Sequence, residues 1–144
     1  MESSVIVVTI PGEPKAQGRA RAVRFGNSVH MYDPKGSAEW KGAAAWYMKI
    51  AMKGRPPIAG AVRLSATFLF AMPKSRCRKK APRPAEWHTK KPDLDNLLKA
   101  VKDAAKGILW VDDSQVCEYA TVNKRTERQG AAPGVTLWVE EIGK

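Results

Sequence analysis

Acidic residues are concentrated in one short part of this chain. Five of the 14 acidic residues lie between positions 93 and 115, although the chain of 144 residues carries a formal charge of +11. A basic protein attracts polyanions such as nucleic acids, and clustered carboxylates repel the same partner. A divalent cation between the carboxylates and a phosphate removes this conflict. The pattern therefore predicts a metal-dependent enzyme that acts on nucleic acid.

The first carboxylates form the motif Asp93-Leu94-Asp95, directly before an apolar helical pattern. In extended backbone, residues two positions apart face the same side, and Pro92 favours extended backbone in front of it. We therefore expect an extended segment that presents Asp93 and Asp95 together, with Asp95 near the N-cap of the helix. Such oxygen ligands suit Mg²⁺.

A lysine and a second acidic pair extend this set. Lys99 lies one turn after Asp95 on the same helical face, where its ammonium group would stabilise phosphoryl charge or orient a water. Asp112-Asp113 follows a short apolar segment, so the chain can fold back and bring a third carboxylate to the first two. Three carboxylates and a lysine are typical of Mg²⁺ nucleases. A structural alternative stays open, in which Asp95 caps the helix, Asp93 is solvated and Lys99 pairs with Asp95.

Hydrophobic periodicity predicts the elements that must position these residues. Alternating or β-branched segments indicate strands at 5–10, 61–72, 115–123 and 135–142. Apolar residues at three- and four-residue steps indicate helices at 34–53 and 95–106. The Gly- and Arg-rich segment 13–33 is expected to be a long loop with a short hairpin around Gly26-Asn27. The order β-α-β-α-β-β predicts an α+β fold, a small mixed sheet with two helices packed on it.

Positive charge gathers in two loops. No acidic residue occurs between Glu39 and Glu86, and the proline-rich loop 73–92 is strongly basic. A loop of this length in a compact domain is functional or disordered, and we expect an arm that is mobile in the free protein and ordered on DNA. The predicted DNA-binding residues are Lys15, Arg19, Arg21, Arg24, Arg76, Arg78, Lys79, Lys80, Lys90 and Lys91.

Length and composition fit a single domain spanning residues 1–144. No apolar run approaches the roughly 20 residues that cross a bilayer, and the N-terminus lacks a basic leader with a cleavage site. We therefore expect a cytoplasmic protein without a membrane partner. The sequence contains no Walker loop, no G-x-S-x-G motif and no histidine paired with a nucleophile.

Around its carboxylates the chain resembles the RusA family of Holliday-junction resolvases, found in bacteria and their phages. The resemblance rests on Asp93-Leu94-Asp95-Asn96-Leu97-x-Lys99 and on Trp110-Val111-Asp112-Asp113-x-Gln115-Val116, and it extends weakly over nearly the whole chain. It implies a homodimeric endonuclease that cuts four-way DNA junctions symmetrically with Mg²⁺ or Mn²⁺, in recombination and repair. The basic loop before Asp93 is longer than in the family pattern.

The resemblance also implies roles for single residues. The essential carboxylates of the family, which are catalytic and bind the metal, match Asp93, Asp95 and Asp113, and its essential lysine matches Lys99. Asp112 is the adjoining acid and a further candidate metal ligand.

Two other functions compete with a nuclease. One is a non-catalytic basic module that binds nucleic acid and whose carboxylates only cap a helix. The other is a phage accessory protein without catalysis. Nicking of a synthetic four-way junction in Mg²⁺ indicates the enzyme, whereas a gel shift alone indicates a binding protein.

Overall fold

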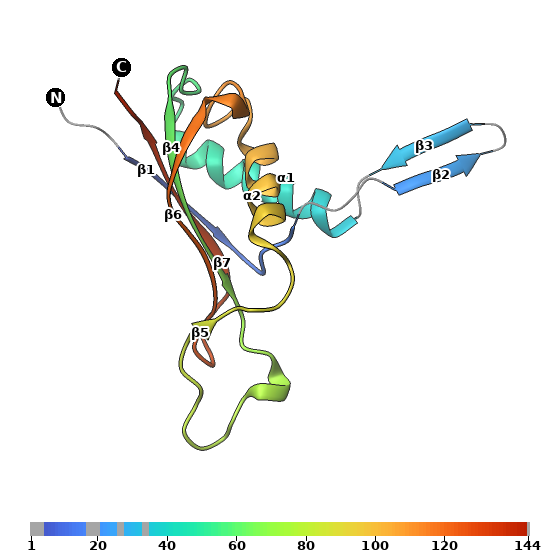
Figure 1. Ribbon diagram of the computed structural model, residues 1–144, viewed down its shortest axis with the longest axis vertical. Coiled ribbons are helices and arrows are strands. Elements are labelled where there is room, and N and C mark those ends of the chain that lie inside the picture. Colours follow the sequence, from blue (N-terminus) through green and yellow to red (C-terminus); the bar gives the residue numbers. More distant parts are fainter. Residues whose placement is uncertain (1–4, 17–20, 26–27, 33–34, 144) are drawn as a thin grey trace.

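The computed structural model describes residues 5–16, 21–25, 28–32 and 35–143, with side chains for 5–16 and 36–143. Within these residues the main element is a five-stranded sheet in the order β1-β7-β4-β6-β5 (Figure 1). Its strands β4 and β6 run parallel, and the other neighbours run antiparallel. The strands are β1 (Val5–Pro11), β4 (Val62–Phe70), β5 (Glu86–Trp87), β6 (Val116–Thr126) and β7 (Gly134–Glu141).

Two α-helices, α1 (Lys35–Met52) and α2 (Leu94–Ala105), pack on the same face of this sheet (Figure 1). Helix α2 lies in the crossover from β4 to β6, as a connection between parallel neighbours requires. Short 3₁₀ turns, η1 (Lys74–Arg76) and η2 (Asp113–Gln115), lie before β5 and before β6. A separate hairpin pairs β2 (Arg21–Phe25) with β3 (Ser28–Tyr32).

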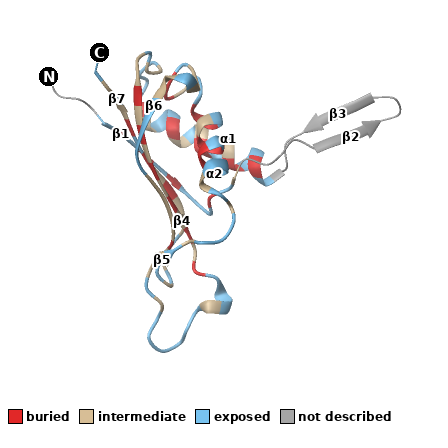
Figure 2. Ribbon diagram, in the orientation of Figure 1, coloured by how far each residue is buried: buried red, intermediate tan, exposed pale blue. Residues whose placement is uncertain are grey.

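The core lies between the helices and the covered face of the sheet (Figure 2). Strand β4 alternates buried and half-buried residues along its whole length, because successive side chains point to opposite faces. Leu64 and Phe68 of β4 are fully buried, and Leu97 and Val101 of α2 are buried in the same cluster. The apolar face of α2 therefore fixes the helix against the sheet and leaves its polar face to solvent.

The α+β fold class is confirmed, and the six predicted elements follow one another in the predicted order, with the β2–β3 hairpin and strand β5 as additional elements. A hairpin does form in the segment 13–33, but its expected turn, Gly26-Asn27, lies outside the described residues. Strand β5 was not predicted, since two residues are too few to show a period. No helix in the described part of the chain is long and apolar enough to cross a membrane.

The basic loop 73–92 extends beyond the sheet at the end away from the two termini (Figure 1). Hydrogen bonds hold it there. The side-chain oxygen of Gln129 accepts from the amides of Arg78 (2.9 Å) and Arg83 (3.2 Å), and its nitrogen donates to the carbonyl of Arg78 (2.7 Å). Arg76 pairs with Glu86 at 2.8 Å. The loop thus has a defined hydrogen-bonded course in the free chain, and its response to DNA stays a prediction.

Candidate active site

Asp93 is the N-cap residue of α2, with extended backbone angles of φ −72° and ψ 148°. Because the helix begins at Leu94, Asp95 already lies in its first turn. Asp95 therefore lies near the N-cap, as expected, but the prediction of extended backbone through Asp95 is wrong, because only Asp93 is extended. Pro92 restricts the residue before it and does not prevent the helix from starting at Leu94.

Asp95 does not cap the helix as the alternative interpretation required, whereas Asp93 is exposed to solvent, as that interpretation also expected. Asp93 makes no capping hydrogen bond through its side chain. Among the described residues, no side-chain hydrogen bond or ion pair engages Asp93 or Asp95, and both residues are exposed. The expected ion pair between Lys99 and Asp95 is also absent from the described part of the chain. The carboxylates and this ammonium group are therefore accessible to a ligand.

An open cleft of about 440 Å³ lies between α2, η2 and β6. It brings together residues that are up to 24 positions apart in the sequence, and Asp95, Lys99 and Asp113 all line it. The four other lining residues are Leu98, Lys102, Asp103 and Tyr119. The crossover from α2 back to β6 thus achieves what the sequence predicted for Asp113, which faces the same space as Asp95. Asp93 is not among the residues that line this cleft.

The side chain of Asp113 is held by Trp110, whose indole Nε1 donates to Asp113 Oδ1 at 2.8 Å. Trp110 is fully buried, so this contact anchors the carboxylate to the core. The turn after α2 depends on Gly107, whose φ of +83° favours glycine. The second oxygen of Asp113 has no hydrogen-bond partner among the described residues and remains available in the cleft.

Asp112 has a different environment from its neighbour. Its carboxylate accepts from the hydroxyl of Ser114 (2.6 Å) and from the amide of Ser114 (3.0 Å). Its other oxygen lies 3.3 Å from the ammonium group of Lys106. These contacts, the Ser114 hydroxyl first, lower the pKa of Asp112 from 3.8 to about 2. Asp112 therefore caps η2, and both of its oxygens are engaged.

Gln115 completes this turn, although its role was not foreseen from the sequence. Its side-chain oxygen accepts from the amide of Asp112 at 2.7 Å, which closes a capping box. Its nitrogen donates to the carbonyls of Ile58 (2.7 Å) and Gly60 (2.9 Å). Gln115 thus ties the turn that carries Asp113 to the segment before β4. A glutamine three residues after an aspartate was the available signal.

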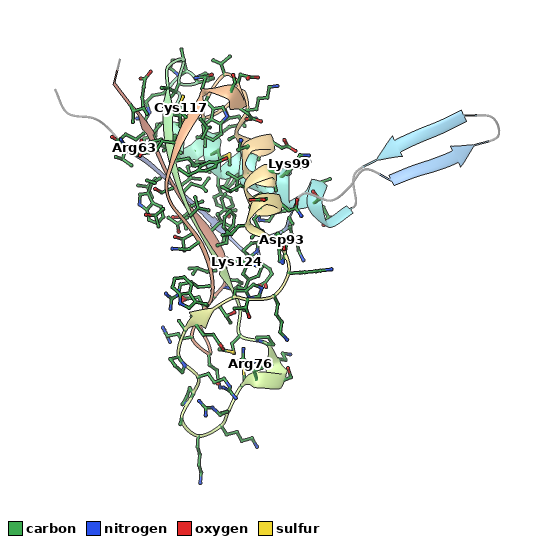
Figure 3. The ribbon with its side chains drawn as sticks, viewed as in Figure 1. Arg63, Arg76, Asp93, Lys99, Cys117 and Lys124 are labelled. Carbon is green, nitrogen blue, oxygen red and sulfur yellow. The ribbon has the colours of Figure 1, made fainter. Side chains whose placement is uncertain are left out.

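The segment in front of Asp93 is held from β6. Lys124 Nζ donates to the carbonyls of Lys90 and Pro92, both at 2.7 Å, and Figure 3 shows Lys124 close to Asp93 at the base of α2. His88 Nε2 lies 3.0 Å from the carbonyl of Lys91, and Nδ1 lies 2.9 Å from Thr126 Oγ1. Nε2 must therefore donate, because a carbonyl only accepts. Nothing local in the sequence indicates these contacts.

The predicted DNA-binding residues fall into three groups. Arg76 is paired with Glu86, so its charge is partly neutralised. Arg19 lies outside the described residues, as do the side chains of Arg21 and Arg24. The remaining predicted cations are exposed, as phosphate contacts require: Lys15, Arg78, Lys79, Lys80, Lys90 and Lys91.

The carboxylates were also compared with the requirements of a metal ion. In the described part of the chain, no three His, Cys, Asp or Glu side chains are grouped so that they could hold a metal. The donor chemistry nevertheless fits Mg²⁺, which prefers one or two carboxylates together with waters and substrate phosphates over a cage made by the protein alone. Asp93 and Asp95 have free oxygens, and Asp113 has one.

The chain is also similar to known proteins. The family model for endodeoxyribonuclease RusA matches residues 11–140. Uncharacterized protein YqaN of Bacillus subtilis (strain 168) is 35% identical over 144 aligned residues, which cover 95% of this chain and 96% of that protein. The family match includes both segments that line the cleft and the loop 73–92 between β4 and α2.

Proposed function

The chain belongs to the RusA family of endodeoxyribonucleases, and from that premise we propose that it is a metal-dependent, structure-selective nuclease that resolves four-way DNA junctions by paired symmetric nicks. The family implies endonuclease activity on Holliday junctions, a branched DNA substrate. The metal dependence, the symmetry of cutting and a role in recombination and repair are our proposal. So is its place, the cytoplasm of a bacterial or phage-infected cell.

The observation that carries this proposal is the unpaired state of the carboxylates. Asp93 and Asp95 are exposed and form no side-chain hydrogen bond or ion pair with the described residues, in a protein with a net charge of +11. Carboxylates that only stabilised the fold would cap the helix or pair with nearby cations. A ligand site for a cation explains why they do neither.

The proposed roles follow from these positions. Asp93, Asp95 and Asp113 would hold the divalent ion, which when bound polarises the phosphate and makes water a better nucleophile. Lys99 would stabilise negative charge on the phosphoryl oxygens from the same cleft. Trp110 would keep Asp113 in a fixed orientation through its hydrogen bond. Asp112 supports the turn, and we do not include it among the ligands.

We further propose that residues 1–144 form a single nuclease domain and that two copies of the chain form a homodimer. Two incisions in strands related by two-fold symmetry need two equivalent sites, and a C₂ dimer provides them. Apolar surface for such contact is present. Val7 and Trp138 are cross-strand partners on the open face of the sheet, exposed by 52% and 39%, and Trp46 of α1 is exposed by 59%. Trp40, in contrast, is buried in the core. Light scattering at micromolar concentration should give about twice the monomer mass, and a monomer both free and on DNA would exclude paired cutting by one assembly.

The test of the activity is cleavage of a labelled synthetic four-way junction with Mg²⁺ and with EDTA. We expect paired nicks in Mg²⁺ only, and linear duplex of the same sequence should remain uncut. Asp93→Asn, Asp95→Asn and Asp113→Asn should each abolish cutting and leave junction binding in EDTA equal or tighter, because each removes a negative charge that repels phosphate. Binding without cleavage by the wild-type protein would favour a non-catalytic DNA-binding protein instead.

A further inference from the structure

The polar face of α2 continues past Lys99 with a second cation. Asp95, Lys99, Lys102 and Lys106 follow one another at i, i+4, i+7 and i+11, a spacing that places all four on one side of a helix. Lys106 is paired with Asp112 at 3.3 Å. The other acid at this side of the cleft, Asp103, is paired with Lys41 at 3.8 Å.

Like Lys99, Lys102 has no carboxylate partner among the described residues. Its ammonium group instead donates to the hydroxyl of Tyr119 at 3.3 Å and lies 5.9 Å from the centre of that ring. Tyr119 comes from β6, directly across the cleft, and is 47% exposed. Because its oxygen accepts from Lys102, the phenol proton remains free to donate to another group. Together they present a positive charge and a hydrogen-bond donor.

On the basis of the proposed function, we propose that Lys102 and Tyr119 bind the phosphodiester next to the scissile one on the same DNA strand. The two lysines are three residues apart, which is about 4.5 Å along a helix. The side chain of each lysine is a flexible four-carbon stem that ends in an ammonium group, so the two groups can spread to reach neighbouring phosphates of one strand. A strand that runs along α2 can therefore place one phosphate at Lys99 and its neighbour at Lys102. The pair sets the register of the strand in the cleft.

The test joins a protein variant to a change in one phosphate. The incision is first mapped on an unmodified junction, and the phosphodiester on either side of it is then replaced by an uncharged methylphosphonate. We expect the wild-type protein to cut one of these two substrates about 10-fold more slowly, as the loss of a charged hydrogen bond implies. Lys102→Gln should cut the unmodified junction about 10-fold more slowly than the wild type does. Its rate should not fall further on the methylphosphonate junction that slows the wild type. Such non-additivity shows a direct interaction.

Other variants separate the contact from a general loss of charge. Lys102→Arg should restore most of the cleavage rate. Tyr119→Phe should lower the rate by less than Lys102→Gln does and should be equally insensitive to the methylphosphonate. Lys49→Gln removes an exposed charge near the end of α1 and should behave as wild type on every substrate. All variants should keep the wild-type melting temperature, because neither side chain is buried.

Failure of this inference can be distinguished from failure of the proposed function. If the wild type cuts and the losses from Lys102→Gln and from either methylphosphonate multiply, the subsite is excluded while the nuclease stands. If the wild type cuts nothing, the nuclease is excluded and no incision can be mapped, so the methylphosphonate is instead placed in turn at each phosphate around the branch point. Junction affinity in EDTA then decides the phosphate contact: a non-additive loss with Lys102→Gln at one position supports it, and additive losses at every position exclude it.

Discussion

Lys124 Nζ lies 2.7 Å from the carbonyl oxygen of Pro92, the residue immediately before Asp93. A second bond of the same length joins this ammonium group to the carbonyl of Lys90. The cation belongs to β6, on the other side of the crossover, and holds the backbone that leads into α2. Because Asp93 has no contact of its own side chain to fix it, its position depends on this backbone.

We predict that Lys124→Met lowers junction cleavage about 10-fold and raises the Mg²⁺ concentration that gives half-maximal rate. The variant loses two charge-assisted hydrogen bonds to the segment that carries Asp93, so a proposed ligand of the ion becomes less well placed. The measurement is a Mg²⁺ titration of the cutting rate, with Lys49→Met as a control for lost charge. Lys124→Arg should restore part of the Mg²⁺ response. A lower melting temperature with an unchanged Mg²⁺ response would indicate a purely structural role.

The fold was largely predictable because its strands and helices carry strong periods. Side chains alternate in burial along β4, and α2 buries its apolar residues on one face. Each pattern repeats several times along its element, so it can be recognised in the sequence. The start of α2 was misplaced because Asp93 and Asp95 are both good N-cap residues. Local sequence does not decide between them.

The contacts around the candidate site were less predictable for a different reason. Lys124 meets Pro92, and Trp110 meets Asp113, only after the chain has crossed from α2 to β6. Such contacts depend on strand pairing and on the register of β6 beside β4, which a single sequence does not reveal. The carboxylates themselves, by comparison, lie close together in the sequence and could therefore be identified from it.

We predict that Lys99→Ala loses at least about 100-fold in the cleavage rate, with a melting temperature within about 1 °C of wild type. Lys99 is exposed, and the described residues offer it no ion pair, so its removal costs no packing or pairing. Cleavage should be measured at saturating junction, where binding differences do not contribute. If the variant melts several degrees lower but cuts at the normal rate, Lys99 supports the helix and has no part in catalysis.

Asp112 should stabilise the protein in a way that depends on pH. Its pKa is lowered to about 2 from the ordinary 3.8 by Ser114 and Lys106, so the folded state favours the charged form. Its contribution to the free energy of unfolding is therefore complete above about pH 4 and is lost as the pH falls through about 2. We predict that Asp112→Ala melts below wild type at pH 7. The difference should shrink steadily between pH 4 and pH 2, as measured by circular dichroism. A difference that is the same at pH 2 and pH 7 would show that charge is not its cause.

Three neighbouring exposed cations of the loop 73–92, Arg78, Lys79 and Lys80, should contribute to DNA affinity through counterion release. Each phosphate contact adds roughly 0.9 to the slope of log affinity against log salt on duplex DNA, so replacing Arg78, Lys79 and Lys80 by glutamine should lower the slope by up to about 2.7. Gln129→Ala tests the loop without changing charge, because the Gln129 side chain bonds the backbone of Arg78 and Arg83. It should weaken junction binding and keep most of the slope. If the triple variant leaves the slope unchanged, these three side chains do not contact phosphates, and other cations, such as Lys90, Lys91 or those of residues 15–24, must hold the DNA.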